Sequence, residues 1–182
     1  MSLSLVLLSM FCTAQESTVK TNLNALTSIL DSDKSIMKYT ESSERHTMLL
    51  SALRASELDA VLAYDGQFTV FAPSNLAFEK LSAITVNRLL DPQNKEVLRA
   101  VLSYHIIAGK LSASKILKAM CRGMGQATFT TILGEKITAS MSGTDIVLTD
   151  QQGNRSKIIL ADSIRCNGVI HEVDSVFMPL KI

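Results

Sequence analysis

The chain has 182 residues, of which 47% are hydrophobic, and this length suits one domain with a sizeable core. Its 18 Lys and Arg residues against 17 Asp and Glu residues give a net charge of +1, so no overall field attracts nucleic acid or an anionic membrane. Nucleic acid is therefore not expected as a partner.

The amino-terminal fourteen residues carry no charge and are largely apolar from Leu3 to Phe11. They end in Thr13-Ala14, which has the form of the small-residue cleavage site of a secretory signal. The apolar run is too short to span a bilayer, and the basic start of a typical signal is missing. We expect residues 1–14 to be a signal peptide, no membrane span, and a location that is secreted, periplasmic or at the cell surface.

Helical patterns then occupy most of the first half of the chain. Residues 15–46 are predicted to form an amino-terminal extension with a first helix, and two short amphipathic helices follow from Thr47. Residues 68–72 have strand character, and Pro73 ends the strand because proline lacks a donor for the ladder. Ser74 can then cap the next helix with its hydroxyl oxygen.

Two further caps are predicted in the middle of the chain. Asp91 stands before Pro92, which suits the first turn of a helix that continues to Tyr104. Ser112 is placed to cap a shorter helix that ends near Cys121.

Five short runs rich in β-forming residues follow, separated by turns that contain Gly or Asn. These runs are residues 127–133, 135–141, 145–149, 157–161 and 169–173. We therefore predict an α+β domain over residues 47–182, with a meander of antiparallel strands after a cluster of short helices. The early strand at residues 68–72 must join this late sheet to bury both of its faces.

Three segments carry a recognisable family pattern. They are FTVFAPSNLAF at residues 68–78, LRAVLSYHIIAGK at residues 98–110 and NGVIHEVDSVFMP at residues 167–179. In this order and at this spacing, the chain resembles the fasciclin domain family, whose members include fasciclin I, periostin and secreted bacterial proteins. The resemblance implies a wedge-shaped β-sandwich with small helices, used outside cells for adhesion or for contact with matrix or polysaccharide. It implies no catalysis and no cofactor.

The resemblance also points to a partner-binding segment. In some animal members the Tyr-His segment is linked to integrin recognition, and it corresponds here to Tyr104, His105, Ile106 and Ile107. Tyr and His each present an apolar body and a polar tip suited to an interface. From the residues alone we favour a core role for His105, in which the imidazole exchanges one hydrogen bond with a backbone carbonyl and one with a donor.

The residue pattern gives little support to catalysis or metal binding. After removal of the leader, Cys121 and Cys166 permit either one disulfide or two buried free thiols. Neither cysteine lies at Cys-x-x-Cys or Cys-x-x-His spacing, so no metal site is expected. His171 and Glu172 fall on opposite faces of a strand, which weakens an acid–base site with His105. No catalytic residue is predicted.

We therefore predict a non-catalytic module that binds an extracellular or cell-surface protein, or a polysaccharide. A modest basic face between Lys110 and Arg122 suits acidic polysaccharide, although a solvated helix face is the usual explanation of such a pattern. The first alternative is a carrier of a small apolar ligand in a pocket between helices and sheet. The second is a hydrolase, which would need His105, His171 and a carboxylate within hydrogen-bond reach.

Overall fold

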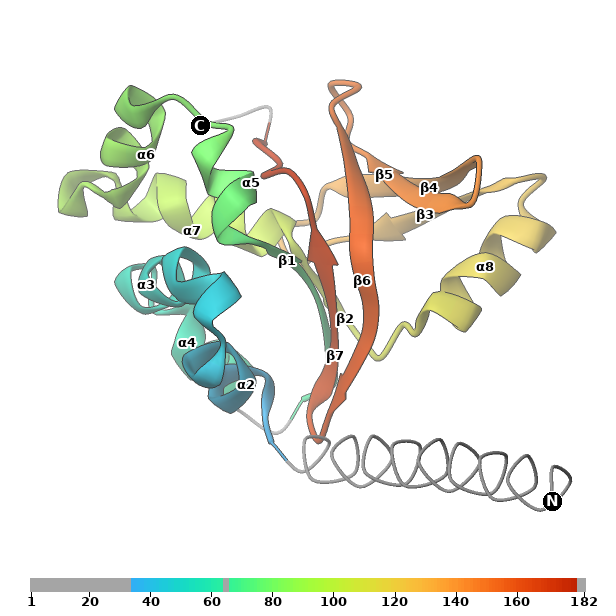
Figure 1. Ribbon diagram of the computed structural model, residues 1–182, viewed down its shortest axis with the longest axis horizontal. Coiled ribbons are helices and arrows are strands. Elements are labelled where there is room, and N and C mark those ends of the chain that lie inside the picture. The colour runs from blue at the N-terminus through green and yellow to red at the C-terminus, as the bar shows by residue number, and fades with distance from the viewer. Residues whose placement is uncertain (1–33, 64–65, 180–182) are drawn as a thin grey trace, which may run out of the picture.

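A computed structural model describes residues 34–63 and 66–179, so the expected signal peptide and most of the amino-terminal extension lie outside the described residues. Among these residues, helices fill the first half and strands dominate the second (Figure 1). The helical elements are α2 (Ile36–Ser42), η1 (Glu44–His46), α3 (Thr47–Ala55), α4 (Leu58–Ala63), α5 (Asn75–Glu79), α6 (Ala83–Leu90), η2 (Pro92–Asn94), α7 (Lys95–Tyr104) and α8 (Ala113–Arg122).

The strands form a seven-stranded sheet with the order β2-β1-β7-β6-β5-β4-β3. They are β1 (Phe68–Pro73), β2 (Ile106–Ala108), β3 (Gln126–Thr130), β4 (Lys136–Ser142), β5 (Asp145–Thr149), β6 (Arg155–Arg165) and β7 (Gly168–Val173). The predicted α+β fold is confirmed. The early strand β1 pairs with the closing strand β7 as expected, but this pair is parallel, whereas the other strand pairs are antiparallel.

The long strand β6 gives the sheet its wedge shape. Its first residues, Arg155 to Lys157, pair with β5, and the residues from Ile158 to Arg165 pair with β7. The register with β7 shifts on both sides of Leu160, and such irregularities bend a strand. The sheet therefore turns at β6 into two halves that diverge in Figure 1.

Two apolar cores lie on opposite faces of the β1–β7 pair. The first lies between this pair and the helices α2, α3, α4 and α7, with Leu49, Leu102 and Ile170 among its buried residues. The second core lies between the two halves of the sheet and α8, around Phe71 and Phe177. Strand β7 is consequently buried along its whole length, and its motif residues serve both cores.

The predicted caps are confirmed. The hydroxyl oxygen of Ser74 accepts a hydrogen bond from the Ala77 N–H, and Asp91 and Ser112 do the same for η2 and α8. Each such cap stabilises a helix end by about 1 kcal/mol. These helix starts were readable because a cap acts within three residues of itself.

Three elements go beyond the predictions. Helix α2 contributes the buried Ile36 to the first core, and α6 begins at the cap Ser82. Strand β2 follows α7 after a single residue and pairs antiparallel with β1. Because β2 has only three residues, it offers too short a run to show an alternating pattern.

Candidate interaction surface

The imidazole of His105 is buried in the second core beside Phe177. Its Nδ1 lies 2.8 Å from the Val101 carbonyl oxygen, and the Phe177 N–H donates to its Nε2 at 3.0 Å. Since Nε2 accepts, the proton sits on Nδ1 and is donated to Val101. Burial lowers the pKa of His105 to about 4, so the ring is neutral at pH 7. His105 therefore has the core role that the sequence favoured.

Tyr104 lies in the same core with its ring tilted against Phe177. Its hydroxyl donates to the Lys136 carbonyl and accepts from the Gln151 N–H, both at 3.3 Å. Burial is the main reason that the pKa of the Tyr104 hydroxyl is raised above its usual value. The hydroxyl thus joins α7 to the far half of the sheet.

The four residues of the expected partner-binding segment are therefore interior residues. Tyr104, His105, Ile106 and Ile107 are each at most 5% exposed. A side chain with so little exposed area offers almost no surface to a partner, because interface energy comes from side chains that become buried only on binding. The structure places these four side chains in the core, and any partner contact must come from exposed residues.

His171 is also buried and stacks on the Phe71 ring. Its Nε2 lies 2.7 Å from the Leu111 carbonyl oxygen, and the Asp162 N–H donates to its Nδ1. Burial lowers the pKa of His171, which keeps the ring neutral. Neither His171 nor His105 is hydrogen-bonded to a carboxylate in the described part of the chain, so the constellation required for a hydrolase is not assembled there.

The asparagines of the motifs act as joints between distant elements. Asn167 accepts from the Ile36 N–H at 2.8 Å and donates to the Leu62 carbonyl at 2.6 Å, which ties α2 and α4 to the turn before β7. Asn75 accepts from the Met48 N–H and donates to the Glu44 carbonyl, which fixes the start of α3. Both amides are fully occupied in holding the scaffold.

The sequence left open a disulfide between Cys121 and Cys166. Both thiols are free in the structure, and both are exposed rather than buried. Cys121 lies in α8, and Cys166 lies in the turn between β6 and β7. Between residues 34 and 179, leaving out 64 and 65, no group of three or more His, Cys, Asp or Glu residues is arranged to hold a metal ion.

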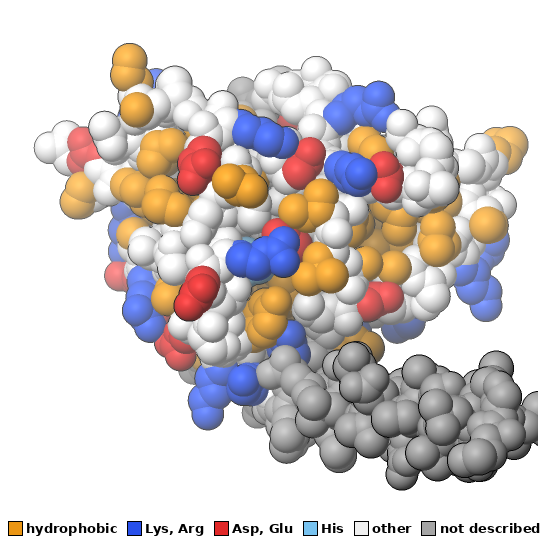
Figure 2. All heavy atoms as spheres, in the orientation of Figure 1, with side chains coloured by type: hydrophobic (Ala, Val, Ile, Leu, Met, Phe, Trp, Pro, Cys, Tyr) orange, Lys and Arg blue, Asp and Glu red, His pale blue; other side chains and the backbone are white. Residues whose placement is uncertain are grey.

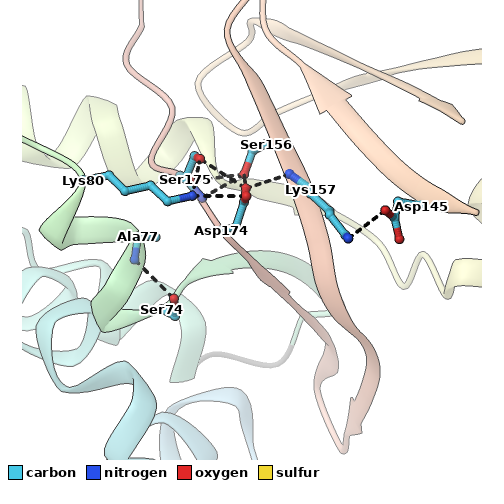
Figure 3. A network of polar contacts seen from close by, with 8 residues as sticks. All are labelled: Ser74, Ala77, Lys80, Asp145, Ser156, Lys157, Asp174 and Ser175. Carbon is cyan, nitrogen blue, oxygen red and sulfur yellow. Dashed lines mark hydrogen bonds and ion pairs between the residues drawn. The ribbon is translucent and has the colours of Figure 1, made fainter. Parts of the chain in front are cut away.

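A network of charged side chains crosses the surface between α5 and β5, as Figure 3 shows. Asp174 accepts from the Lys157 N–H at 2.8 Å and from the Ser156 hydroxyl, and it pairs with Lys80 at 3.2 Å. Burial opposes its ionisation, but these donors outweigh burial and lower the pKa of Asp174. The Lys157 ammonium in turn pairs with Asp145 at 2.7 Å. Positive and negative groups alternate here, so the network offers little net charge.

A second cluster joins η1 to β7. The buried carboxylate of Glu172 pairs with Arg45, and its Oε2 lies 3.7 Å from Nε2 of His46. Burial is the main cause that lowers the pKa of His46, against the raising effect of Glu172. His46 Nδ1 bonds to the Ser43 hydroxyl at 2.8 Å. The His46 and Glu172 side chains are each 2% exposed, whereas the Arg45 side chain is 60% exposed, so Arg45 covers a buried carboxylate from the solvent side.

The clearest hollow with an apolar lining lies among helices α3, α5 and α6. This groove has a volume of about 410 Å³. Its lining residues are Met48, Asn75, Phe78, Glu79, Leu81, Ala83, Val86 and Asn87. Ligand sites are commonly concave, mainly apolar and of roughly 300–1,000 Å³, so the groove has a suitable size. We call it the α5–α6 groove.

Exposed apolar side chains lie on the two helices that flank the α5–α6 groove. Leu76 in α5 is 69% exposed and Ile84 in α6 is 81% exposed. Figure 2 shows hydrophobic side chains gathered over the region where Figure 1 draws α5 and α6. No helix was predicted at residues 83–90, although Ser82 before Ala83 was an available signal for the start of α6.

Comparison with known proteins gives a consistent result. Residues 44–179 match the family model described as the Fasciclin domain. The protein sll1483 of Synechocystis is 34% identical over 149 residues, which cover 82% of this chain and 76% of that protein. The transforming growth factor-beta-induced protein ig-h3 of Sus scrofa is also 34% identical, over 145 residues. This match covers 79% of the chain but only 19% of ig-h3, so the chain corresponds to about a fifth of that relative.

A solved structure supports the same fold. The FAS1 domain pair of the insect cell adhesion molecule fasciclin I superposes with a TM-score of 0.72 at 15% sequence identity. The match covers 81% of this chain and 52% of the solved one. Separately, none of the helices in the described ranges, 34–63 and 66–179, combines the length and the apolar character needed to cross a bilayer.

Proposed function

Because the chain belongs to the fasciclin domain family, we propose that it is a non-catalytic adhesion or binding module that contacts an extracellular or cell-surface protein, or a polysaccharide. The proposed location is secreted, periplasmic or at the cell surface, in keeping with the apolar amino terminus of the sequence. The insect protein with the same fold is named as a cell adhesion molecule.

One structural observation carries this proposal. The polar residues of the three motifs bond to backbone groups inside the protein, as His105, His171 and Asn167 illustrate. A catalytic group must reach a substrate with its reactive atom, and neither nitrogen of either imidazole is available for this. Motif residues that hold the scaffold together leave the exposed surface to make contacts, which is the arrangement expected of a binding module.

Binding of the full chain to panels of matrix proteins, envelope proteins and glycans tests the proposal. We expect saturable binding to at least one member, without chemical change of that partner. The variants Leu76→Ser and Ile84→Ser alter exposed apolar side chains without touching the core, so they report whether the α5–α6 region takes part. An absence of binding across the panels, or turnover of a panel member, contradicts the proposal.

The α5–α6 groove favours a second candidate function, the carriage of a small apolar ligand. The sequence placed such a pocket between helices and sheet, whereas this groove lies among three helices. Its floor includes Met48, Phe78 and Leu81, and methionine adapts its shape to different apolar ligands.

The uncharged dye Nile red tests the carrier function, because its fluorescence rises in apolar surroundings. We expect Ala83→Phe to fill the groove and to abolish binding of the dye, since Ala83 is an exposed lining residue. Gln126→Phe, on the exposed side of β3, is the matched control and should bind as the parent does. Equal binding by both variants would exclude the groove as the carrier site.

A further inference from the structure

The positive charge of this nearly neutral protein is unevenly distributed. No Asp or Glu occurs from Val97 to Gly134, although the chain contains 17 acidic residues in total. The same stretch contains the cations of α8 and its approach, which are Lys110, Lys115, Lys118 and Arg122, together with Arg99 in α7. A local excess of one sign produces a local field even when the net charge is close to zero.

The fold places three of these cations in one row on the outside of α8. The helix is anchored by its buried side chains Ile116 and Met120. Lys115, Lys118 and Arg122 are exposed and follow at intervals of three and four residues, which puts them on one helix face. At 1.5 Å per residue the row is about 10 Å long. We call these three residues the α8 basic row.

No ion pair within residues 34–63 and 66–179 neutralises the α8 basic row. Lys115 donates to the Lys110 carbonyl, and Lys118 and Arg122 form no ion pair with any described residue. Four other surface cations do have acidic partners: Arg54 pairs with Glu41, Lys80 with Asp174, Lys95 with Glu57 and Lys157 with Asp145. The charges of Lys118 and Arg122 are not offset in this way within the described residues.

An acidic side chain contacts α8 at its amino-terminal end. The carboxylate of Asp162 accepts from the Ala113 N–H in the first turn of α8, at 2.8 Å. Within the described residues, Lys118 and Arg122 in the carboxyl-terminal half of the row form no hydrogen bond or ion pair with an acidic side chain. Figure 1 shows α8 at the edge of the molecule, away from the helix cluster, and Figure 2 shows Lys and Arg side chains on that side.

We propose that the α8 basic row is the site at which this protein binds an anionic polysaccharide. The inference rests on the proposed function and names the class of partner. A linear polymer with repeated carboxylate or sulfate groups can contact all three cations at once, and it releases its counterions when it does so. Such contacts are made by the charged ends of the three side chains, so binding requires no apolar burial.

An anionic membrane is the competing partner, and the structure favours it less. An interfacial helix binds lipid by inserting its apolar face 5–10 Å into the headgroup region. In α8 that face, with Ile116 and Met120, is already buried in the second core. The large exposed apolar side chains on or just after α8 are Leu117 and Met124, which are two residues and not a whole apolar helix face. Charge contact therefore remains the main source of affinity.

The test uses the full chain with four probes: heparin as a sulfated polymer, alginate as a carboxylated polymer, dextran as a neutral polymer, and phosphatidylserine vesicles. We expect binding to heparin or alginate, or to both, and none to dextran. Lys118→Gln with Arg122→Gln should weaken this binding about tenfold, because two of three charge contacts are removed. Binding should also weaken as NaCl rises, since the screening length falls from about 10 Å at 0.1 M to 3 Å at 1 M.

The matched control is Lys38→Gln with Arg88→Gln, which removes the same charge from exposed positions on α2 and α6. This control should bind as the parent does, and thermal unfolding should show that both double variants remain folded. Equal effects of the two double variants would overturn the assignment to α8, and stronger binding to the vesicles than to either polymer would replace the glycan with a membrane. If the chain binds a protein from the panels but no polyanion, this inference fails while the proposed function stands.

Discussion

The ring of His105 serves two buried backbone groups, the Val101 carbonyl and the Phe177 N–H. His105→Phe fills a similar volume but leaves the Phe177 N–H without a partner, and such a loss costs about 1–3 kcal/mol. We expect the free energy of unfolding in urea to fall by about that amount. Tyr104 and the surface should keep their arrangement, so partner binding of the folded fraction is expected to be unchanged. If His105→Phe instead keeps the stability of the parent but no longer binds the partner, His105 has a role in recognition.

Asn167 holds a donor of α2 and an acceptor of α4 with one amide. Replacing it with Ala removes both hydrogen bonds, and we expect a loss of about 2–3 kcal/mol in the free energy of unfolding. Asn87→Ala, at an exposed position on α6, is the control and should change stability by less than about 0.5 kcal/mol. Chemical denaturation of both variants makes the comparison, and equal stabilities would contradict the role of Asn167 as a joint.

The difference between these residues shows what a sequence can predict. The core role of His105 followed from its place at the end of an apolar helix, and the cap at Ser74 followed from a contact only three residues away. The partners of Asn167 lie 105 and 131 residues away, and no local pattern carries that information. Exposure was equally hidden, because Ile106 and Ile107 are buried in cores that include the distant residues Ile170 and Phe177.

At the scale of elements, the pairing of β1 with β7 depends on Gly168. A Cβ at this position would lie 2.0 Å from the Phe68 carbonyl oxygen, which is backbone and has no room to move. We expect Gly168→Ala to separate the two strands locally and to cost about 3 kcal/mol or more, within the range of severe packing defects. Cys166→Ala, at the exposed neighbouring turn, is the control. If both variants unfold at nearly the same temperature as the parent, the strands tolerate the extra methyl group and the expectation is wrong.

The elements also differ in how far they could be predicted. Strands β3 to β7 are rich in β-forming residues and are separated by turns that contain Gly or Asn, so their order was readable, but β6 runs from Arg155 to Arg165 and is longer than the predicted 157–161. The parallel direction of the β1–β7 pair could not be predicted, because the alternation of side chains along a strand is the same whichever way its neighbour runs. Helix α6 was missed because only Leu89 is fully buried on it and its apolar stripe is incomplete.

For the whole molecule, the three histidines give a common dependence on pH. Burial is the main cause that lowers the pKa of His46, His105 and His171 in the folded state. The unfolded chain therefore binds more protons below pH 6.5, and stability falls as the pH decreases through this range. For His105, a pKa of about 4 in place of 6.5 corresponds to about 3 kcal/mol once both states are protonated.

Urea unfolding at pH 7.5, 6.0 and 4.5 measures this dependence. We expect the free energy of unfolding to be nearly constant above pH 7 and to decrease progressively at the two lower values. In His105→Phe the decrease should be smaller, because one of the three groups no longer titrates. Stability that rises on acidification would mean that the rings gain rather than lose protons on folding.

The parallel pairing of β1 with β7 has a consequence for how the polypeptide acquires its structure. The paired residues are about a hundred positions apart, and closing a flexible loop of that length costs roughly 4 kcal/mol of chain entropy. Contacts of high sequence separation slow folding into the millisecond-to-second range. The two cores share this strand pair, so neither core can be completed until β7 has been synthesised. Until then the apolar surfaces of the new chain stay exposed, and productive folding requires that they do not associate with those of other chains.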